Sequence, residues 1–561
     1  MATIPVVVKH QGTKYDIDVD PESTGDVFKF QLYSVTGVEP ERQKILVKGG
    51  QVKDDTPMSK FDFKPGQTIM MLGTPGKEGQ EVLARPKEPI KFVEDMTEAE
   101  AAQQEGAIPA GLANLGNTCY LNSTLQTLRA IPELQNALTE YVPQNTSGAG
   151  LLPPLDLTKQ LRELYKYMSQ TQEAYTPQVF LTALRTAFPQ FAERSRTGHG
   201  FAQQDAEEAW SQIVTQLRQK LRVKDAPGAP ETSFIDKYMQ GEFTSELECD
   251  EPAAKEGGEQ PVVSKETFLK LNCHIDGNTN HLRDGIANGL SEKVEKRSEV
   301  LGRDAVYTKT SKISRLPKYL TVHFVRFFWK RETQKKAKIM RKVTFPHELD
   351  LVEFCDDKLK GMLVPVRDKV REVRKDEEDI ERARKRRKRN AAGEDQADIP
   401  GGKGTKKDDK KEESKAGTSA DGDVEMGETY KTDAEIDAER DAALLAAKKE
   451  LNALIDPSLA NDDGANQSGL YELRGVVTHQ GASADSGHYT AYVKKTAPVD
   501  AKTGKRKEED GKWWWFNDDK VSEVTADKIE ALAGGGESHS ALILLYRAIP
   551  LPSAEGTLEF E

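Results

Sequence analysis

Cysteine is scarce in this chain, and its spacing excludes two common uses of the residue. Among 561 residues there are four cysteines, at positions 119, 249, 273 and 355, and no two of them form a C-x-x-C pair. A disulfide framework and a zinc ribbon both need paired or closely spaced cysteines. The sequence therefore predicts neither a bound metal nor a disulfide, and the expected compartment is reducing, in the cytoplasm and the nucleus.

Long apolar runs and an excess of basic residues are also missing. No segment approaches the roughly twenty consecutive apolar residues that a membrane span requires, and no signal peptide precedes Thr3. The formal net charge is −12, which gives no reason to expect binding to nucleic acid or to a membrane. The length of 561 residues is enough for several domains.

The most informative segment present is GLANLGNTCYLNSTLQTL, at 111–128. Its apolar residues recur at helical spacing, at Leu121, Leu125 and Leu128. This pattern predicts a helix that begins at or just before Cys119, with Asn117 or Thr118 as the N-cap. A thiol on the first helical turn faces unpaired backbone N–H groups and the positive end of the helix dipole, which favour the thiolate. Cys119 is therefore a candidate nucleophile.

The residues before the cysteine bear on a second interpretation, in which Cys119 is a small buried apolar side chain, the commoner case for a lone cysteine on a helix. Asn114 and Asn117 can donate amide hydrogen bonds to an anion that develops on a carbonyl oxygen, and Gly116 allows the backbone to approach closely. These are the properties of an oxyanion site. The segment therefore favours acyl transfer over simple burial.

A base for such a reaction lies far downstream, in THQGASADSGHYTAYVKK at 478–495. His488 follows a turn rich in glycine, serine and alanine and opens an alternating run that is typical of a strand. In WWWFNDDKV, at 513–521, an aromatic strand ends in Asn517 and Asp518, and either side chain could accept the second N–H of the histidine ring. An ordinary acidic turn explains the second segment when it is taken alone.

These segments resemble the cysteine and histidine boxes of the ubiquitin-specific proteases. FAQQDAEEAW, at 201–210, is similar to the QQD motif of that family, and KISRLPKYLTVHFVRF, at 312–327, to the strand region before the histidine box. The resemblance extends from about Ile108 to about Pro550, with one insertion. It implies an α+β fold with a papain-like catalytic domain of fingers, palm and thumb, and a thiol-dependent deubiquitinase without cofactor. Many members bind zinc in the fingers, which the cysteine spacing predicts to be absent here.

The resemblance implies functions for single residues. Cys119 would attack the carbonyl of the terminal glycine of ubiquitin, His488 would be the base, and Asn114 would be the oxyanion donor. Asn517 would orient the base, and because many relatives have Asp at this position, it stays open whether Asp518 shares that task. The residues expected to bind the tail of ubiquitin are Gln204, Asp205, Glu208, Gly487 and Tyr489.

Two of these binding residues are acidic and lie three positions apart. The resemblance implies that Asp205 and Glu208 meet arginines in the C-terminal tail of ubiquitin. A spacing of three places both on one face of a helix, where they could hold guanidinium groups at two points. Without the resemblance, the pair would be interpreted as a solvated helix face.

The N-terminal segment has a pattern of its own. TIPVVVKH and TKYDIDVD, separated by a turn, predict a β-hairpin, and QKILVKGG and QTIMMLG predict two further strands. A helix is predicted between them, with apolar positions before Gly37 at Phe28, Leu32 and Val35. Together these elements resemble a ubiquitin-like domain, which implies a β-grasp fold. The chain continues past Gly73, so the domain has no free Gly-Gly end and is not expected to be conjugated.

A ubiquitin-like domain followed by this protease domain resembles the proteasome-associated members of the family. The resemblance implies that the N-terminal domain docks on the regulatory particle of the 26S proteasome, where the protease removes ubiquitin from bound proteins. The expected partners are therefore ubiquitin, ubiquitinated proteins and the proteasome, and the free chain is expected to be a monomer. The strand around Ile45 and Val47 is the expected docking surface.

The domain boundaries follow from these motifs and from composition. A ubiquitin-like domain is expected at 1–75, a flexible polar linker at 76–104, a catalytic domain at 105–550 and a C-terminal tail at 551–561. A charged insertion interrupts the catalytic domain at 366–467, and its composition predicts that it is largely disordered.

Two features of the insertion leave alternatives open. RARKRRKR, at 382–389, has seven basic residues in eight and could serve nuclear import or bind an acidic partner, although a solvated charged run explains it equally well. DAERDAALLAAKKELNALI, at 437–455, predicts a helix that packs on the protease or frays. Three functions therefore remain: an active deubiquitinase at the proteasome, a catalytically idle ubiquitin-binding adaptor of the proteasome, and a nuclear factor. The full set of candidate catalytic residues favours the first.

Two loops are candidates for regulating the site. FFWKRETQKKAKIMRK, at 327–342, carries aromatic residues and many cations, and GASADSG, at 481–487, directly precedes His488. In the resembled proteases, equivalent loops cover the groove for the ubiquitin tail until ubiquitin binds or the proteasome engages. Surface loops without a function are the ordinary alternative.

Overall fold

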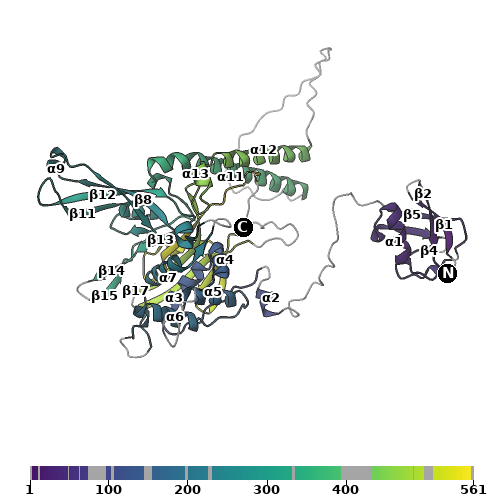
Figure 1. Ribbon diagram of the computed structural model, residues 1–561, viewed down its shortest axis with the longest axis horizontal. Helices are drawn as coiled ribbons and strands as arrows, with labels where there is room; N and C mark the ends of the chain where they lie inside the picture. The colour runs from purple at the N-terminus through teal and green to yellow at the C-terminus, as the bar shows by residue number, and fades with distance from the viewer. Residues whose placement is uncertain are drawn as a thin grey trace, which may run out of the picture. The chain divides into compact units, whose positions relative to one another are not determined.

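The computed structural model divides into two compact units, residues 1–94 and 95–561, and each is described by itself (Figure 1). The residues that the structure describes are 3–10, 13–47, 50–61, 63–73, 97–102, 106–143, 155–195, 200–224, 230–330, 335–392, 432–483, 486–497 and 509–556. All contacts given below are between these residues.

The first unit is a five-stranded sheet covered by one helix. Its strands are β1 (Ile4–His10), β2 (Thr13–Val19), β3 (Lys44–Val47), β4 (Gly50–Gln51) and β5 (Gln67–Leu72), in the order β2-β1-β5-β3-β4 with β1 and β5 parallel. Helix α1 (Gly25–Thr36) buries Phe28 and Leu32 in the core and ends at Gly37, whose φ of 67° suits glycine. Two 3₁₀ turns, η1 (Pro40–Arg42) and η2 (Met58–Lys60), complete the unit. The predicted β-grasp fold is confirmed.

The apolar surface of this unit differs from the expected one. Ile45 is fully buried in the core, and Val47 is half-buried. Because successive side chains of a strand point to opposite faces, the intervening Leu46 is exposed, opposite its paired residue Met70 on β5. Leu46, Met70 and Leu72 are 46%, 51% and 51% exposed. The prediction that Ile45 and Val47 form a docking surface is therefore wrong for Ile45, and the exposed apolar residues of these strands are Leu46, Met70 and Leu72. Helix α1 exposes a further set, Val27, Phe30, Tyr33 and Val35.

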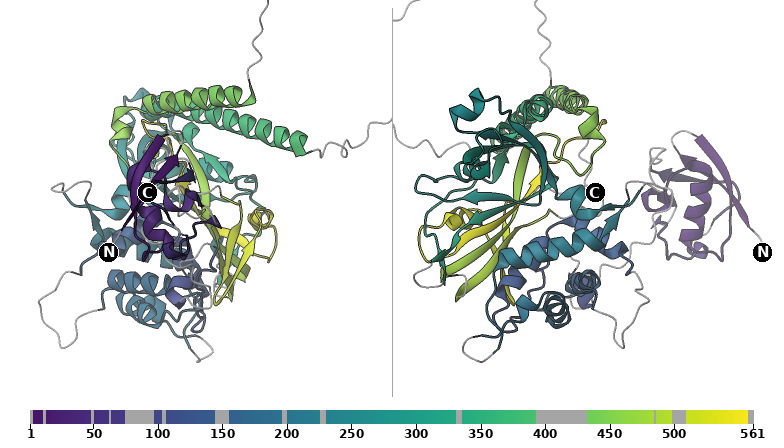
Figure 2. Two further views of the ribbon diagram at one scale, coloured as in Figure 1. Left: turned by 90° about the vertical axis from the view of Figure 1, so that its right-hand side faces the viewer. Right: turned by 60° about the vertical axis from the view of Figure 1, so that its left-hand side comes forward.

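In the second unit, helices gather on one side of a long sheet (Figure 2). They are α2 (Glu98–Ala102), α3 (Cys119–Leu128), α4 (Pro132–Glu140), α5 (Leu157–Met168), α6 (Gln178–Ala187), α7 (Ala206–Lys220) and α8 (Phe234–Tyr238), with a 3₁₀ turn η4 (Pro189–Ala192). All ten residues of α3 are buried, the polar ones included. This helix is therefore the centre of the helical part, and the prediction that it begins at Cys119 is confirmed.

The long sheet has ten strands. Its main path is β10 (Leu271–His274), β13 (Tyr319–Val325), β21 (Ser540–Ala548), β17 (Leu470–Ser483), β18 (Ser486–Lys494), β19 (Trp513–Asn517) and β20 (Lys520–Val524). The strands β14 (Phe327–Lys330), β15 (Lys335–Lys338) and β16 (Glu348–Asp350) pair beside it. Helix α3 packs on β17, β18 and β19, so one end of the helix meets the strands that carry the predicted base and its partner.

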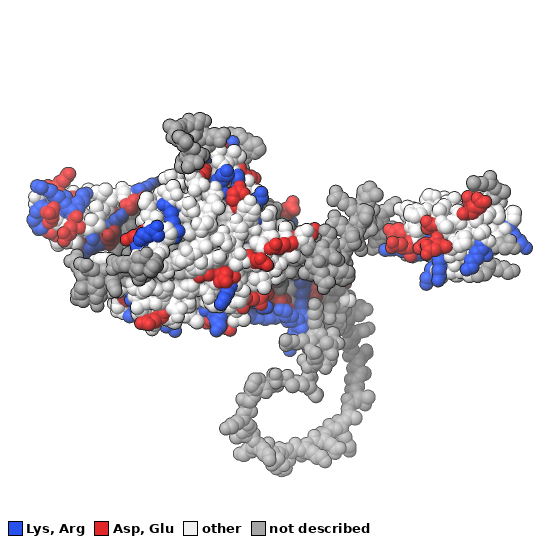
Figure 3. All heavy atoms as spheres, turned by 90° about the horizontal axis from the view of Figure 1, so that it is seen from below, with Lys and Arg blue, Asp and Glu red and all other residues white. Residues whose placement is uncertain are grey.

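A separate sheet of four strands projects from this unit, in the order β11-β12-β8-β9 (Figure 1). Its strands are β8 (Gly241–Cys249), β9 (Val262–Phe268), β11 (Ser291–Arg297) and β12 (Asp304–Arg315), next to helices α9 (Pro252–Glu256) and α10 (Leu282–Gly289). Lys, Arg, Asp and Glu crowd the end of this projection (Figure 3), where they form the ion pairs Lys255–Glu248, Lys293–Asp250 and Arg303–Glu251. These six charged residues are therefore paired with one another.

The part of the chain that the structure describes has neither a metal-binding cluster nor a membrane-spanning helix. It holds no group of three or more His, Cys, Asp and Glu residues that could bind a metal ion. The four cysteines are free and buried. Within the same residues, no helix has both the length and the apolar composition for crossing a membrane.

The charged insertion differs from the prediction at both of its ends. Residues 357–392 form one long helix, α11 (Asp357–Ala392), and residues 433–453 form α12 (Asp433–Ala453), followed by α13 (Pro457–Ala460). The helices α11 and α12 lie side by side (Figures 1 and 2). The expectation that 366–467 is largely disordered is therefore wrong for these parts, while 393–431 lies outside the described residues. The helix predicted at 437–455 is confirmed, although α12 begins and ends earlier, at Asp433 and Ala453, and it packs rather than frays.

The physical reason is a narrow apolar stripe within a charged sequence. Buried valines recur on α11 at spacings of four and three, at Val366, Val370 and Val373, and they pack with Leu451 of α12. Toward the other end of α11 the contacts become ionic, with Arg384 bound to Asp441 at 2.7 Å and Arg387 to Asp437 at 2.8 Å. Part of the basic run at 382–389 is thus paired within the fold.

Other short elements complete the second unit. They are β6 (Arg222–Val223), β7 (Thr232–Ser233), η5 (Val352–Phe354), α14 (Asp527–Glu530) and η6 (Ala531–Ala533). Helix α2 falls within the range predicted as linker, but its Ala101 carbonyl accepts a hydrogen bond from Gln172 at 2.9 Å. The linker prediction is therefore wrong for 97–102, and 76–96 lies outside the described residues.

Candidate active site

Cys119 is the first residue of α3 and is 3% exposed. Thr118 occupies the N-cap position, and its hydroxyl accepts a hydrogen bond from the Leu115 N–H at 3.0 Å. Asn117 before it has a φ of 54°, a left-handed conformation that places a tight bend immediately ahead of the helix. Of the two predicted caps, the structure therefore selects Thr118.

The thiol is held in its protonated form by its surroundings. Burial, with a smaller contribution from the nearby Asp518 carboxylate, raises the pKa of Cys119 to about 11, although a hydrogen bond from the Tyr489 N–H acts in the opposite direction. The expectation that the helix N-terminus favours the thiolate is thus outweighed by desolvation. This thiol needs a base, and the Tyr489 contact places the residue that follows His488 against the sulfur.

His488 on β18 and Asn517 at the end of β19 are brought together by the antiparallel pairing of these strands. The His488 Nε2 atom lies 2.6 Å from Asn517 Oδ1. An amide oxygen can only accept a hydrogen bond, so Nε2 donates and carries the proton. The neutral ring then has Nδ1 as its basic nitrogen, as a base for a neighbouring thiol requires.

Asp518 lies next to Asn517 but makes different contacts. Its Oδ2 atom accepts a hydrogen bond from the Asn114 side chain at 2.8 Å, and its Oδ1 atom one from the Asn122 side chain at 2.8 Å. The structure therefore gives the histidine contact to Asn517 and directs Asp518 to the loop before the cysteine. Asn517 and Asp518, which the sequence left as alternatives for orienting His488, thus make different contacts.

Asn114 is held at both ends of its amide. Its Oδ1 atom accepts hydrogen bonds from the backbone N–H groups of Gly116 at 2.9 Å and Thr118 at 3.3 Å. Its nitrogen donates to Asp518 as described above. The amide of Asn117 is engaged elsewhere, because it donates to the Phe201 carbonyl at 3.0 Å. Each of the two predicted oxyanion donors thus has one amide N–H engaged and one left, and Asn114 differs in that its oxygen is held as well, which fixes the direction of its remaining N–H.

Three predicted substrate-binding residues, Gln204, Asp205 and Glu208, lie at the N-terminal end of α7. Asp205 is the N-cap of α7, and its carboxylate accepts a hydrogen bond from the Glu207 N–H at 2.9 Å. Glu208, three residues on, is half-buried. The side-chain nitrogen of Gln204 is buried and has no hydrogen-bond partner among the described residues. Asp205 therefore stabilises the helix in addition to any function in binding.

The remaining two predicted binding residues flank His488. Gly487 has a φ of 130°, and a Cβ atom there would overlap the Gln480 carbonyl oxygen and come within 2.7 Å of the His479 ring. Only glycine fits such a position. Tyr489 is buried beside α3, with its N–H directed at Cys119. Of this pair, Tyr489 thus contacts the nucleophile directly.

Two further histidines, His539 and His479, lie near His488 and are not among the predicted site residues. The rings of His539 and His488 are 6.3 Å apart, and His539 Nδ1 lies 3.0 Å from the Thr478 hydroxyl. Burial lowers the pKa of His539 to about 4 and that of His479 to about 3, so both rings are neutral near pH 7. His479 lies at the start of the segment that carries His488, whereas His539 lies in none of the motifs described above, and pairing of the strands brings both to the site.

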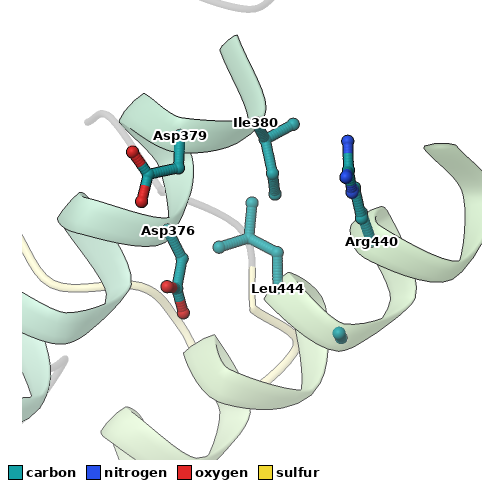
Figure 4. A pocket seen from close by; sticks show the side chains of 6 residues that line it. Asp376, Asp379, Ile380, Arg440 and Leu444 are labelled. Carbon is teal, nitrogen blue, oxygen red and sulfur yellow. The ribbon is translucent and has the colours of Figure 1, made fainter. Parts of the chain in front are cut away.

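A pocket of about 280 Å³ lies away from this site, between α11 and α12 (Figure 4). Ile380 and Leu444 point toward one another across it, with Asp376 and Asp379 on α11 and Arg440 on α12 around them. None of the candidate catalytic residues lines it. The chemistry of the molecule therefore centres on Cys119 and His488, and not on this pocket.

Comparison with known families agrees with this geometry. The family model for ubiquitin carboxyl-terminal hydrolases matches residues 110–546, and that for the ubiquitin family matches residues 6–76. The chain belongs to the ubiquitin carboxyl-terminal hydrolase family. Both matches agree with the two units of the structure, with the cysteine and histidine segments inside the hydrolase match.

Relatives in this family are similar to the chain over nearly its whole length. Ubiquitin carboxyl-terminal hydrolase 6 of Schizosaccharomyces pombe is 44% identical over 545 residues, which cover 97% of this chain and 99% of that protein. Ubiquitin carboxyl-terminal hydrolase 6 of Arabidopsis thaliana is 38% identical, with 97% and 98% covered. Ubiquitin carboxyl-terminal hydrolase 14 of Caenorhabditis elegans is 32% identical, with 97% and 94% covered. The combination of both units in one chain is therefore shared with these relatives.

Proposed function

We propose that this chain removes ubiquitin from proteins at the 26S proteasome, with Cys119 as the nucleophile and His488 as the base. As a member of its family, the chain is a cysteine-type deubiquitinase. The observation that carries the assignment of residues is the 2.6 Å contact between His488 and Asn517. The residue after His488 on the same strand, Tyr489, donates its backbone N–H to the Cys119 sulfur.

The proton of Cys119 has to leave before the sulfur can attack. Because burial raises the pKa of the thiol to about 11, the free thiol is a weak nucleophile near neutral pH. Transfer of its proton to His488 Nδ1 makes the thiolate, and Asn517 stabilises the resulting imidazolium by accepting its Nε2–H. The thiolate then attacks the terminal glycine carbonyl of ubiquitin.

The charge that develops on the carbonyl oxygen needs donors. The Asn114 amide uses one N–H for Asp518, which leaves its second N–H for the oxyanion, together with backbone N–H groups at the start of α3. When the intermediate collapses, His488 returns its proton to the departing amine, and ubiquitin stays on Cys119 as a thioester. Water, activated by the same histidine, then releases ubiquitin and regenerates the thiol.

Docking on the proteasome is assigned to the ubiquitin-like unit. The support for this is its exposed apolar face, made by Leu46, Met70 and Leu72 on adjacent strands. Contiguous apolar surface of this kind is typical of binding sites for other proteins. The same proposal includes two further points: the free chain is a monomer, and it acts in the cytoplasm and the nucleus.

Regulation by the two loops is also part of the proposal. The strands β14 and β15 form a hairpin, and Ala337 of β15 pairs with Ser483 at the end of β17. The Lys338 ammonium group donates to the His479 carbonyl at 2.7 Å. These contacts join the loop at 327–342 to the loop at 481–487, next to His488. Opening of both would thus be coupled.

One experiment separates the active enzyme from the idle adaptor. The chain is incubated with ubiquitin that carries a thiol-reactive group at its C-terminus, with and without purified proteasomes. An active enzyme forms a covalent adduct, and proteasomes increase its rate of formation. An adaptor binds ubiquitin and proteasomes but forms no adduct in either condition.

A further inference from the structure

Asn122 is a buried polar residue of α3 that the mechanism above does not use. It is 2% exposed and follows Cys119 by three residues, slightly less than one helical turn. Its side-chain nitrogen lies 3.2 Å from the Leu112 carbonyl, 3.4 Å from the Ala113 carbonyl and 2.8 Å from Asp518 Oδ1. The contact to Asp518 is the shortest of the three and involves a carboxylate, so it is the strongest.

The two oxygens of Asp518 link Asn122 to the predicted oxyanion donor. Asn122 occupies Oδ1, and the Asn114 nitrogen occupies Oδ2 at 2.8 Å. The Asn114 oxygen is held by the Gly116 N–H at 2.9 Å. With both ends engaged, the plane of the Asn114 amide and the direction of its second N–H are fixed.

The backbone of Asp518 has an unusual conformation that its neighbours hold in place. Its φ of 53° lies in the left-handed region that residues other than glycine seldom adopt. Its carbonyl oxygen accepts a hydrogen bond from the Leu112 N–H at 2.9 Å, and a Cβ atom on Gly111 would come within 2.9 Å of that oxygen. The turn is therefore pressed closely against the loop before the cysteine, and Asn122 ties its side chain to a fully buried helix.

We propose that Asn122 is a positioning residue for hydrolysis: it anchors Asp518 and, through Asp518, directs the Asn114 amide at the oxyanion. The inference rests on the proposed function, because Asn114 meets an oxyanion only if Cys119 attacks a carbonyl. The competing interpretation is that Asn122 only fastens α3 to the preceding loop through Leu112 and Ala113. In that case its loss lowers stability and leaves the chemical step unchanged.

A double-mutant cycle separates these interpretations. The full chain is measured with a ubiquitin–fluorophore conjugate as wild type, Asn122→Ala, Asn114→Ala and the double variant. Loss of an oxyanion donor costs about 10²- to 10³-fold in kcat, so misdirecting the donor in Asn122→Ala should cost about 10- to 100-fold with little change in KM. Because Asn122 acts through Asn114, the double variant should be no slower than Asn114→Ala alone.

Ser123→Ala is the matched control, because Ser123 is a buried polar residue of the same helix that bonds only locally, to the Tyr120 carbonyl at 3.0 Å. Asn122→Asp is the second variant, since it keeps the shape of the side chain but cannot donate to Asp518. It should be at least as slow as Asn122→Ala. Alkylation of Cys119 by iodoacetamide should proceed at the wild-type rate in both Asn122 variants. An unchanged rate would show that the thiol itself is unaltered.

Three results overturn the inference. The first is an Asn122→Ala enzyme with the kcat of Ser123→Ala, and the second is a double variant whose losses multiply. The third is failure of both Asn122 variants to fold, which would assign the residue to the fold alone. A wild-type chain that does not hydrolyse the conjugate contradicts instead the proposed function, and with it the basis of the inference.

Discussion

The two sides of the active site are held in different ways. Cys119 belongs to a helix whose residues are all buried, and the loop before it is tied down by Asn114 and Asp518. His488 is only half-buried and lies near the start of a strand, next to a loop joined to β15 through Ala337 and Lys338. The proposed nucleophile is thus part of a core, and the proposed base lies at the border between a strand and the loop before it.

This difference explains how an inactive thiol can become reactive. Burial keeps the Cys119 thiol protonated, so its reactivity depends on a base whose surroundings can change. Any movement of the loops beside His488 would alter access to the site, while the cysteine and its oxyanion donor stay in place. The predictions below test this division, from the largest expected effect to the smallest.

Removal of either reacting side chain should have the largest effect. Cys119→Ala should abolish hydrolysis of a ubiquitin–fluorophore conjugate, and His488→Ala should lower kcat by about 10³-fold or more, as loss of a catalytic triad residue does. Ubiquitin binding should be kept in both, because neither substitution changes any of the residues predicted to bind the tail. Steady-state kinetics and ubiquitin titration measure the two effects. Near-normal turnover by Cys119→Ala would require a different nucleophile.

Asn517→Ala should have a smaller effect, because the base remains and only its orientation is lost. We expect kcat to fall by about 10- to 100-fold, and Asn517→Asp to keep most of the activity, since a carboxylate also accepts the Nε2–H. Asp519→Ala is the matched control, an exposed residue of the same turn. Equal losses in Asn517→Ala and Asp519→Ala would show that the turn matters and the hydrogen bond does not.

Reversal of the two acidic residues on α7 should weaken binding and spare the chemistry. Replacing Asp205 and Glu208 by Lys should lower the affinity for ubiquitin about tenfold or more, because like charges would then face the arginines of its tail. Loss of the Asp205 cap also costs about 1 kcal/mol of stability. The control Asp205→Asn with Glu208→Lys keeps a cap and should still bind poorly. If calorimetry showed an unchanged affinity for ubiquitin, Asp205 and Glu208 would be interpreted as solvated charges without a function in binding.

Lys338→Met should loosen the loops beside His488 and raise the activity of the free enzyme. The substitution keeps most of the side-chain volume and removes the hydrogen bond to the His479 carbonyl. A tenfold shift between closed and open forms needs only about 1.4 kcal/mol, so we expect an increase of about 2- to 10-fold in kcat/KM without proteasomes. A folded Lys338→Met enzyme with lower activity would show that the loops build the site.

Deletion of residues 1–75 should change the intrinsic activity least. All candidate catalytic residues lie in the second unit, so hydrolysis of the conjugate by the shortened chain should stay within about twofold of the full chain. Binding to proteasomes and their stimulation of activity should be lost, because tethering raises the effective concentration at the activator. Leu46→Asp with Met70→Asp should do the same in a folded domain. Undiminished proteasome binding would assign docking to the second unit.

Much of this architecture is predictable from local patterns. Leucine spacing located α3, alternation and turn residues located the β-grasp strands, and the motifs around Cys119 and His488 located the site. Local patterns failed where partners are distant. Asn122 meets Asp518 across 396 residues, and the narrow apolar stripe of α11 is hidden by the average composition of the insertion.

Two further errors have simple physical causes. Ile45 is buried and Leu46 exposed, contrary to expectation, because an alternating strand does not state which face will be covered. The state of the Cys119 thiol was predicted from the helix dipole alone, whereas burial, which only the folded structure reveals, decides its pKa. Sequence motifs thus select the candidate residues, and the fold determines how far Cys119 is buried.

The most direct test is to map the adduct formed with ubiquitin that carries a thiol-reactive group at its C-terminus. All four cysteines, at 119, 249, 273 and 355, are buried. Labelling that depended on exposure alone would therefore not favour any one of them. Mass spectrometry of the digested adduct should find ubiquitin on Cys119 alone, with the reaction slowed strongly in His488→Ala. Labelling of another cysteine, or labelling of Cys119 at an equal rate without His488, would contradict the account.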